Sequence, residues 1–293
     1  MGFSLKEFDH RKEANKNMEF ITPKKVREWL SFKVHSKFKI LKTVFDPAVG
    51  SGQLFQFINS EKYIGCDVSE KSLKCFEENF KNVVAIHSSY FNMVEKIDYD
   101  IAVSNYPFSL NAKDLFNVPP VGLEKFYNKE ITGKADFAFI LKSFLESKHG
   151  GFYLCFPGIT YRSQESKFRD FLIENNYVES FGILKNCEFD ATNIDVFYLE
   201  LSKNRKNNFI ETFTFDFNND NNNITKTIEC ERLKGESWKS PEIEPVIEKI
   251  NIKNIEKEIK FLKNKRRKNE DELDKFIKKT FKFKEEEKNN TLF

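Results

Sequence analysis

The sequence lacks several features that direct a chain toward common classes of protein. Its 293 residues include 5 Cys and 4 His. No Cys-x-x-Cys pair occurs and the His residues lie far apart, so neither a zinc site nor a disulfide framework is expected. No apolar run approaches the length that spans a membrane, and no signal-peptide pattern opens the chain. These absences predict a soluble, cytoplasmic protein without a bound metal.

Excess charge of one sign is also missing. The formal net charge of +3 lies wholly in residues 241–293, which hold 15 Lys+Arg and 12 Asp+Glu, so the first 240 residues are formally neutral. A uniformly basic, histone-like surface is therefore excluded, although local basic faces remain open. Hydrophobic residues reach 40% and Phe occurs 33 times, enough to bury a full-sized core in one principal domain with an appendage.

Strand-like and helix-like patterns alternate along the first 200 residues. Helices are expected over 20–35, from about residue 53, after Ser69, over 135–147 and over 166–177, and strands over about 43–45, 63–66, 83–91, 99–104, 152–157, 178–184 and 195–201. Such alternation predicts an α/β fold whose mostly parallel, doubly wound sheet carries helices on both faces. Period-two alternation around the polar loop 218–223 adds a β-hairpin.

Unusual residues gather where the expected strands end: Asp46–Gly52, Asp67, Ser88–Phe91 and Ser104–Phe108. Ligands bind at the carboxyl ends of strands in parallel sheets. In Asp-Pro-Ala-Val-Gly-Ser-Gly, Gly50 and Gly52 let backbone approach a ligand and the loop opens a helix, but the Lys-Ser/Thr of a triphosphate loop is missing. Asp67 either binds two ribose hydroxyls or caps the helix ahead of Ser69. Together the loop and Asp67 favour an adenosine-bearing cofactor.

These residues, with Asn105-Tyr106-Pro107-Phe108 after the fourth strand, resemble the N6-adenine DNA methyltransferases of the type I modification-subunit kind. That family has an Asp-Pro-Ala-x-Gly-Ser-Gly loop, a catalytic (Asn/Asp/Ser)-Pro-Pro-(Tyr/Phe/Trp) tetrapeptide and an upstream Phe-x-Thr-Pro element, matched at 20–23. Downstream elements match in the same order at 135–139, 150–157 and 189–203. The resemblance covers about residues 18–203.

The resemblance implies a Rossmann-like fold, S-adenosylmethionine as cofactor and a restriction-modification system. The implied cofactor-binding residues are Phe20, Thr22, Pro23, Asp46, Pro47, Ala48, Gly50, Ser51, Gly52, Asp67, Ser89 and Asn105, and the implied catalytic residues are Asn105, Tyr106, Pro107 and Phe108. Thr22 is expected either to bind the methionine carboxylate or to cap the helix before Pro23. The long connection 109–134 is expected to be functional or disordered.

The residue chemistry agrees with adenine as the substrate. The exocyclic amine is a poor nucleophile because its lone pair is delocalised. Acceptance of both N6 hydrogens, by the Asn105 side-chain oxygen and the Tyr106 carbonyl, makes the nitrogen more nucleophilic. Pro107 is expected to fix the turn and Phe108 to stack on a base flipped out of a DNA duplex.

Two departures from the family keep alternatives open. Tyr106 replaces the first Pro of the tetrapeptide, and Ser89 follows the third strand where the family often has an acidic residue. RNA adenine dimethylases also carry a bulky second residue, but their cofactor loop differs. Protein glutamine methyltransferases carry Asn-Pro-Pro-Tyr with another loop. A non-catalytic, cofactor-binding partner subunit belongs to a different functional class.

The expected organisation has three parts: a catalytic domain over 1–203, a β-hairpin extension over 204–240 and a charged helical tail over 241–293. Apolar residues at 3–4 spacing in the tail, including Ile252, Ile255 and Ile259, favour either docking of a partner or packing on the chain's own domain. Residues 204–293 are too few and too charged to read several bases. A separate DNA-specificity subunit, or another protein chain, is therefore expected to dock on residues 242–280 of this tail.

Overall fold

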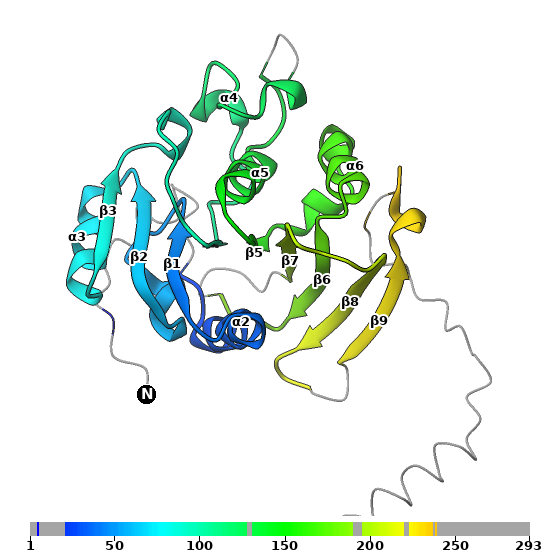
Figure 1. Ribbon diagram of the computed structural model, residues 1–293, viewed down its shortest axis with the longest axis horizontal. Coiled ribbons are helices and arrows are strands. Elements are labelled where there is room, and N and C mark those ends of the chain that lie inside the picture. The colour runs from blue at the N-terminus through cyan, green and yellow to red at the C-terminus, as the bar shows by residue number, and fades with distance from the viewer. Residues whose placement is uncertain are drawn as a thin grey trace, which may run out of the picture. The chain divides into compact units, whose positions relative to one another are not determined.

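One nine-stranded mixed sheet organises the computed structural model, which describes residues 5, 21–127, 131–189, 195–219, 223–236 and 238 (Figure 1). The strands of this part of the chain are, in spatial order, β3 (Val83–His87), β2 (Ser60–Asp67), β1 (Leu41–Asp46), β4 (Ile101–Ser104), β5 (Gly150–Cys155), β7 (Val196–Ser202), β6 (Val178–Lys185), β8 (Phe209–Asp216) and β9 (Ile224–Glu229). The first five strands in this spatial order, β3 to β5, pair in parallel. The predicted mostly parallel sheet is confirmed.

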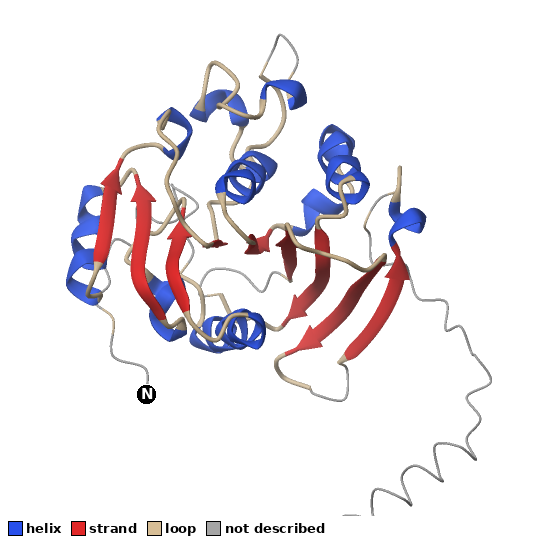
Figure 2. Cartoon of the chain, in the orientation of Figure 1, coloured by secondary structure: helices blue, strands red, loops and turns tan. Residues whose placement is uncertain are grey.

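Helices cover both faces of the sheet (Figures 1 and 2). The α-helices are α2 (Lys24–Lys37), α3 (Glu70–Asn79), α4 (Ala112–Leu115), α5 (Asp136–Glu146) and α6 (Ser166–Glu174). Short 3-10 helices lie at η1 (Gln53–Phe57), η2 (Tyr90–Asn92), η3 (Glu124–Phe126), η4 (Pro157–Thr160), η5 (Ser163–Glu165) and η7 (Cys230–Leu233). Within the described residues, no helix has the length and apolar character needed to cross a membrane.

Strand β5 shows how the two cores arise. All six of its residues are buried. Phe152 and Leu154 join the cluster that includes α2 and α3, whereas Tyr153 and Cys155 join the cluster that includes α5 and α6. Successive side chains of a strand point to opposite faces, so a central strand covered on both sides is apolar throughout. The predicted doubly wound arrangement follows from this burial.

The helix expected after the cofactor loop differs from the prediction. Residues Gln53–Phe57 form a five-residue 3-10 helix rather than an α-helix, because β2 already begins at Ser60 and leaves no length for further turns. So short a helix aligns few peptide dipoles, which weakens the expected anion-binding helix terminus.

The predicted hairpin is confirmed, and it belongs to the main sheet. Strands β8 and β9 pair antiparallel, with Ile210 opposite Ile228, and β8 pairs in parallel with β6. The described residues from 21 to 238 therefore share one sheet. The helical tail predicted over 241–293 lies outside the described residues.

Candidate cofactor and catalytic site

The predicted site residues meet where the strand order reverses. The chain runs outward from β1 to β2 and β3, then returns to place β4 on the other side of β1 (Figure 1). Connections that leave β1 and β4 in opposite directions form a crevice at their carboxyl ends. Asp46 ends β1, Ser104 ends β4 and Asp67 ends the neighbouring β2. The sheet topology thus brings the two main motifs to one edge.

The glycines of the cofactor loop have different surroundings. Gly50 and Gly52 both have positive φ, at 55° and 83°. A Cβ at Gly52 would lie 2.5 Å from Cδ2 of Phe76, whereas a Cβ at Gly50 would meet nothing within 4 Å. Gly52 therefore serves close packing, and Gly50 presents bare backbone to open space, as a cofactor-binding loop requires.

Asp67 holds the cofactor loop against β2. Its Oδ2 accepts from the Gly50 amide at 2.8 Å, and its Oδ1 accepts from the Ser69 amide at 2.8 Å. Ser69 itself caps α3, accepting at its Oγ from the Ser72 amide at 3.3 Å. A carboxylate can accept from several donors at once, so amide bonds of this kind do not prevent the predicted contact with ribose hydroxyls. The ribose contact stays a prediction.

Asp46 joins the predicted cofactor loop to the end of β4. Its side chain is buried, and its Oδ1 accepts from the Ala48 amide at 3.0 Å and from Ser104 Oγ at 2.8 Å. Burial raises the pKa of Asp46 from 3.8 to about 7, partly offset by these two donors. Ser104 was not among the predicted site residues, although it stands beside Asn105 in the sequence. Ser104 is fully buried, and its bond to Asp46 became visible only in the fold.

Thr22 and Asn105 are in direct contact although 83 positions separate them. Asn105 Nδ2 donates to Thr22 Oγ1 at 2.9 Å, and Thr22 is buried. The other end of the Asn105 amide is its oxygen, the acceptor that the proposed chemistry needs. The N-cap of α2 is Pro23, without a side-chain cap bond, so the capping alternative for Thr22 is wrong. The two predicted motifs that contain these residues converge.

The two aromatic rings of the tetrapeptide belong to the core. The Tyr106 ring is 1% exposed and stacks on Phe139, with ring centroids 5.3 Å apart and planes at 6°. Phe108 is 7% exposed and meets Tyr106 edge-on at 5.9 Å. Burial raises the pKa of the Tyr106 hydroxyl well above 10. Of Tyr106, the backbone is thus the part suited to act at the site, and base stacking by Phe108 stays a prediction.

The remaining predicted residues differ in burial and partners. Ser51 is buried, and its Oγ accepts from Gln53 Nε2 at 3.2 Å. Ser89 follows β3 and is half-buried at the same sheet edge. Pro47 is buried between Asp46 and Ala48, and Pro107 is half-buried. Phe20 lies outside the described residues.

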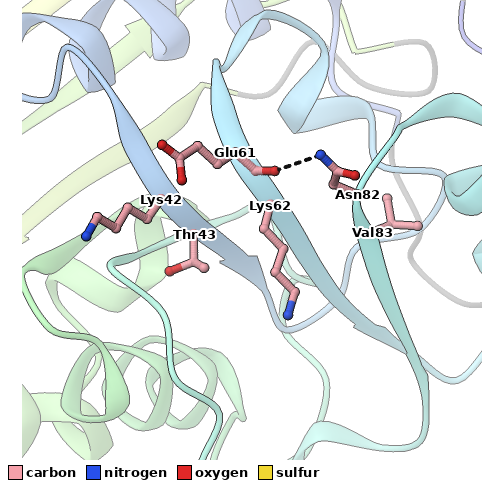
Figure 3. A pocket seen from close by; sticks show the side chains of 6 residues that line it. All are labelled: Lys42, Thr43, Glu61, Lys62, Asn82 and Val83. Atoms are coloured by element: carbon pink, nitrogen blue, oxygen red, sulfur yellow. Dashed lines mark hydrogen bonds between the residues drawn. The ribbon is translucent and has the colours of Figure 1, made fainter.

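A hollow lies at the opposite edge of the sheet from the predicted site residues (Figure 3). Its lining residues stand near the amino ends of β1, β2 and β3: Lys42, Thr43, Glu61, Lys62, Asn82 and Val83. Asn82 Nδ2 donates to the Glu61 carbonyl at 3.3 Å. None of the predicted site residues lines this hollow. In the described ranges no group of three or more His, Cys, Asp and Glu side chains is placed to hold a metal ion.

Comparison with known proteins gives a consistent result. No protein-family model matches the chain. The type I restriction enzyme MpnII methylase subunit of Mycoplasma pneumoniae is 27% identical over 219 residues, which are 64% of this chain and 40% of that protein. The chain thus spans less than half the length of this relative.

Two solved structures share the fold. The type I restriction-modification methyltransferase subunit from Streptococcus thermophilus has a TM-score of 0.57 and 20% identity, covering 73% of this chain and 52% of its own. A Listeria monocytogenes protein assigned to the class I S-adenosylmethionine-dependent methyltransferases has a TM-score of 0.50 and 17% identity, covering 68% and 66%. The fold is therefore that of the class I S-adenosylmethionine-dependent methyltransferases, and in sequence and structure the chain resembles the methylase subunits of type I restriction-modification systems.

Proposed function

We propose that this chain transfers a methyl group from S-adenosylmethionine to the N6 amino group of adenine in DNA, as part of a restriction-modification system. The observation that carries the proposal is a pair of hydrogen bonds that brings three predicted motifs together. Ser104, at the end of β4, donates to Asp46 of the cofactor loop, and Asn105 donates to Thr22 of the upstream Phe-x-Thr-Pro element. An amide acceptor is thereby fixed beside a glycine loop open to a ligand.

The residues present fit the proposed cofactor. A Cβ at Gly50 would meet nothing within 4 Å, and the Asp67 carboxylate, which accepts from the Gly50 amide, can also accept from ribose hydroxyls. Thr22, which accepts from the terminal amide of Asn105, would bind the methionine end. When bound, the cofactor supplies a methyl group on a positively charged sulfur. The chain's part is to hold donor and acceptor in line.

The catalytic turn acts on the amine through two oxygens. The Asn105 side-chain oxygen and the Tyr106 carbonyl accept the two N6 hydrogens, which draws the nitrogen lone pair out of the ring. Both acceptors are fixed, the first by Thr22 and the second by the stacking of the Tyr106 ring on Phe139. Preorganised acceptors of this kind need no rearrangement during transfer.

Tyr106 does not by itself favour an RNA substrate. Its ring fills a core position against Phe139 and Phe108, so packing accounts for a bulky residue there. The cofactor loop remains the feature that favours the DNA enzymes over RNA adenine dimethylases.

Methyl-labelled cofactor tests the proposal directly. The chain, with and without a candidate specificity subunit, is incubated with duplex DNA, RNA or protein, and labelled DNA is digested to nucleosides. We expect N6-methyladenine from the wild type, none from Asn105→Ala, and wild-type amounts from Asn59→Ala, an exposed Asn before β2 at the opposite sheet edge. Label found only in RNA or protein would contradict the proposal.

We further propose that a separate DNA-specificity subunit docks on residues 242–280, which lie outside the described residues. The support is the spacing of apolar residues in the sequence and the likeness to methylase subunits. Deleting 242–293 is expected to abolish subunit capture and sequence-specific methylation while leaving cofactor binding intact. Sequence-specific methylation by the truncated chain would refute this docking site.

A further inference from the structure

The residue that follows the catalytic tetrapeptide has an unusual backbone. Ser109 has a φ of 58° although it is not glycine. A side chain in the left-handed region costs stability, so such residues persist only where their surroundings hold them. Ser109 is the point at which the chain leaves Phe108, so its conformation sets the direction of the whole turn.

A buried carboxylate holds the backbone of Ser109. Asp136, the first residue of α5, is 0% exposed. Its two oxygens accept from the Ser109 amide at 3.3 and 3.2 Å. Burial raises the pKa of Asp136, and the neighbouring Arg162 guanidinium opposes that rise.

A single guanidinium holds the side chain of Ser109 and pairs with the same carboxylate. Arg162 Nη2 donates to Ser109 Oγ at 3.1 Å, and its Nη1 lies 3.6 Å from Asp136 Oδ2. Nη1 also donates to Glu165 Oε1 at 3.0 Å, and Glu165 is 1% exposed. The guanidinium carbon lies 5.3 Å from the centre of the Phe156 ring. The Arg162 guanidinium is therefore held by three side chains: Ser109, Asp136 and Glu165.

Arg162 reaches the turn because its own backbone comes from the neighbouring strand. Arg162 follows β5, which pairs in parallel with β4, so the segments after β4 and after β5 leave the sheet at the same edge. Gly158 makes room for it, since a Cβ there would lie 2.5 Å from Arg162 Nε. The guanidinium therefore lies beside the catalytic turn, in contact with Ser109.

We propose that Asp136 and Arg162 form a clamp that positions the catalytic turn, with both acting on Ser109 and neither touching the substrate. The inference rests on the proposed function, because it assigns these residues to the alignment of Asn105, the Tyr106 carbonyl and Phe108. A buried ion pair contributes little net stability compared with apolar packing. This pair instead fixes one strained residue at the end of the turn, so its loss would give the segment that carries Asn105 and the Tyr106 carbonyl more freedom.

The clamp is tested first at Ser109. Ser109→Gly accepts the same backbone conformation without steric cost, so the unfolding free energy should stay near that of the wild type. The turn becomes freer, and we expect the single-turnover rate of methyl transfer to fall roughly 10- to 100-fold. The dissociation constant of S-adenosylmethionine should not change, because Ser109 lies outside the cofactor loop.

The guanidinium is tested with a conservative pair of variants. Arg162→Gln removes the charge and should reduce the rate at least as much as Ser109→Gly. Arg162→Lys keeps a charge near Asp136 but cannot bridge Ser109 and Glu165, so its rate should lie between those of Arg162→Gln and the wild type. Ser109→Gly combined with Arg162→Gln should be little worse than Arg162→Gln alone, since both changes release the same turn.

Arg205→Gln is the matched control. Arg205 donates to the carbonyl of Phe209 and to Asn176, and it follows β7, whose carboxyl end lies beside the amino end of β5. Arg205 is therefore remote from the catalytic turn, and its replacement by Gln also removes a well-bonded guanidinium. An equal fall in rate for Arg205→Gln would overturn the clamp, because lost stability would then explain both results.

A readout independent of activity separates this inference from the proposed function. Hydrogen exchange of the Ser109 amide should be faster in Arg162→Gln than in the wild type, while exchange in β1 and β5 stays slow. Equal protection of this amide in both chains would overturn the clamp whatever the activity. Protection that falls as expected in a chain that methylates no adenine would support the clamp and refute the proposed function.

Discussion

The two glycines of the cofactor loop offer a sharp comparison, because the same substitution should damage stability at one and ligand binding at the other. A Cβ at Gly52 would lie 2.5 Å from Phe76 Cδ2 and 2.7 Å from Phe80 Cε2. Phe76 is 0% exposed, so its ring cannot move aside. A Cβ at Gly50 meets nothing within 4 Å.

The magnitudes follow from these surroundings. A side chain at a left-handed residue costs roughly 1–2 kcal/mol, and the reduced freedom of the unfolded chain returns about 0.4–1 kcal/mol. Gly50→Ala should therefore lower the unfolding free energy by about 0–1.6 kcal/mol. Overpacking against two rings adds about 1–3 kcal/mol at Gly52, so Gly52→Ala should lose about 1–4.6 kcal/mol.

Urea denaturation of the two variants measures the first difference, and calorimetric titration with S-adenosylmethionine measures the second. Gly50→Ala should remain folded and lose cofactor affinity, because its methyl group would occupy the open space at the loop where the cofactor is proposed to bind. Equal destabilisation by the two variants would refute the packing argument. Wild-type cofactor affinity in Gly50→Ala would refute the placement of the cofactor at this loop.

Three further predictions concern buried groups. The pKa of Asp46 is raised from 3.8 to about 7 by burial, so the folded chain binds this proton more tightly than the unfolded chain does. The associated stability is present below pH 3.8 and is lost as the pH rises through about 7. Asp46→Asn should flatten the pH dependence of the unfolding free energy over this window in urea titrations, leaving a residual slope from Glu165, whose pKa burial also raises to about 7. Thr22→Val removes the acceptor of Asn105 Nδ2, which should cost about 1 kcal/mol in urea denaturation, and it should lower the single-turnover rate as well as the affinity for S-adenosylmethionine. Trp238 is 1% exposed and stacks on Phe181 with ring centroids 5.5 Å apart. Trp238→Ala should lower the unfolding free energy by about 3–5 kcal/mol in urea denaturation. An unchanged denaturation midpoint would show that residue 238 is not part of the core.

Local patterns were sufficient for most elements of the fold. Ser69 caps α3 as predicted, and the apolar runs became strands buried on one or both faces. The α-helix expected after the cofactor loop was wrong, because the length available there depends on where β2 begins, and β2 begins at Ser60 rather than near Tyr63. Strand boundaries depend on pairing with β1, which no local pattern contains.

The site was predictable to the level of motifs and their order. Sequence reasoning named Thr22, Asp46 and Asn105, which hydrogen bonds now join to one another or to the end of β4. It did not name Ser104, Asp136 or Arg162, which the structure brings to the same turn or to the end of β4. Ser104 and Asp136 lie in or beside motifs already noted, yet their burial could not be seen in the sequence. Arg162 resembles any surface arginine until β5 is placed next to β4.

The sequence alone determined the class of fold, the glycine loop and the amide-containing turn, because these depend on residue types at short spacing. Tertiary structure decided which groups meet. It placed the Tyr106 ring in the core, set Thr22 against Asn105, and gave Gly50 and Gly52 different surroundings. Those outcomes depend on contacts between residues up to 83 positions apart, and such contacts exist only once the sheet order brings β1, β4 and β5 together.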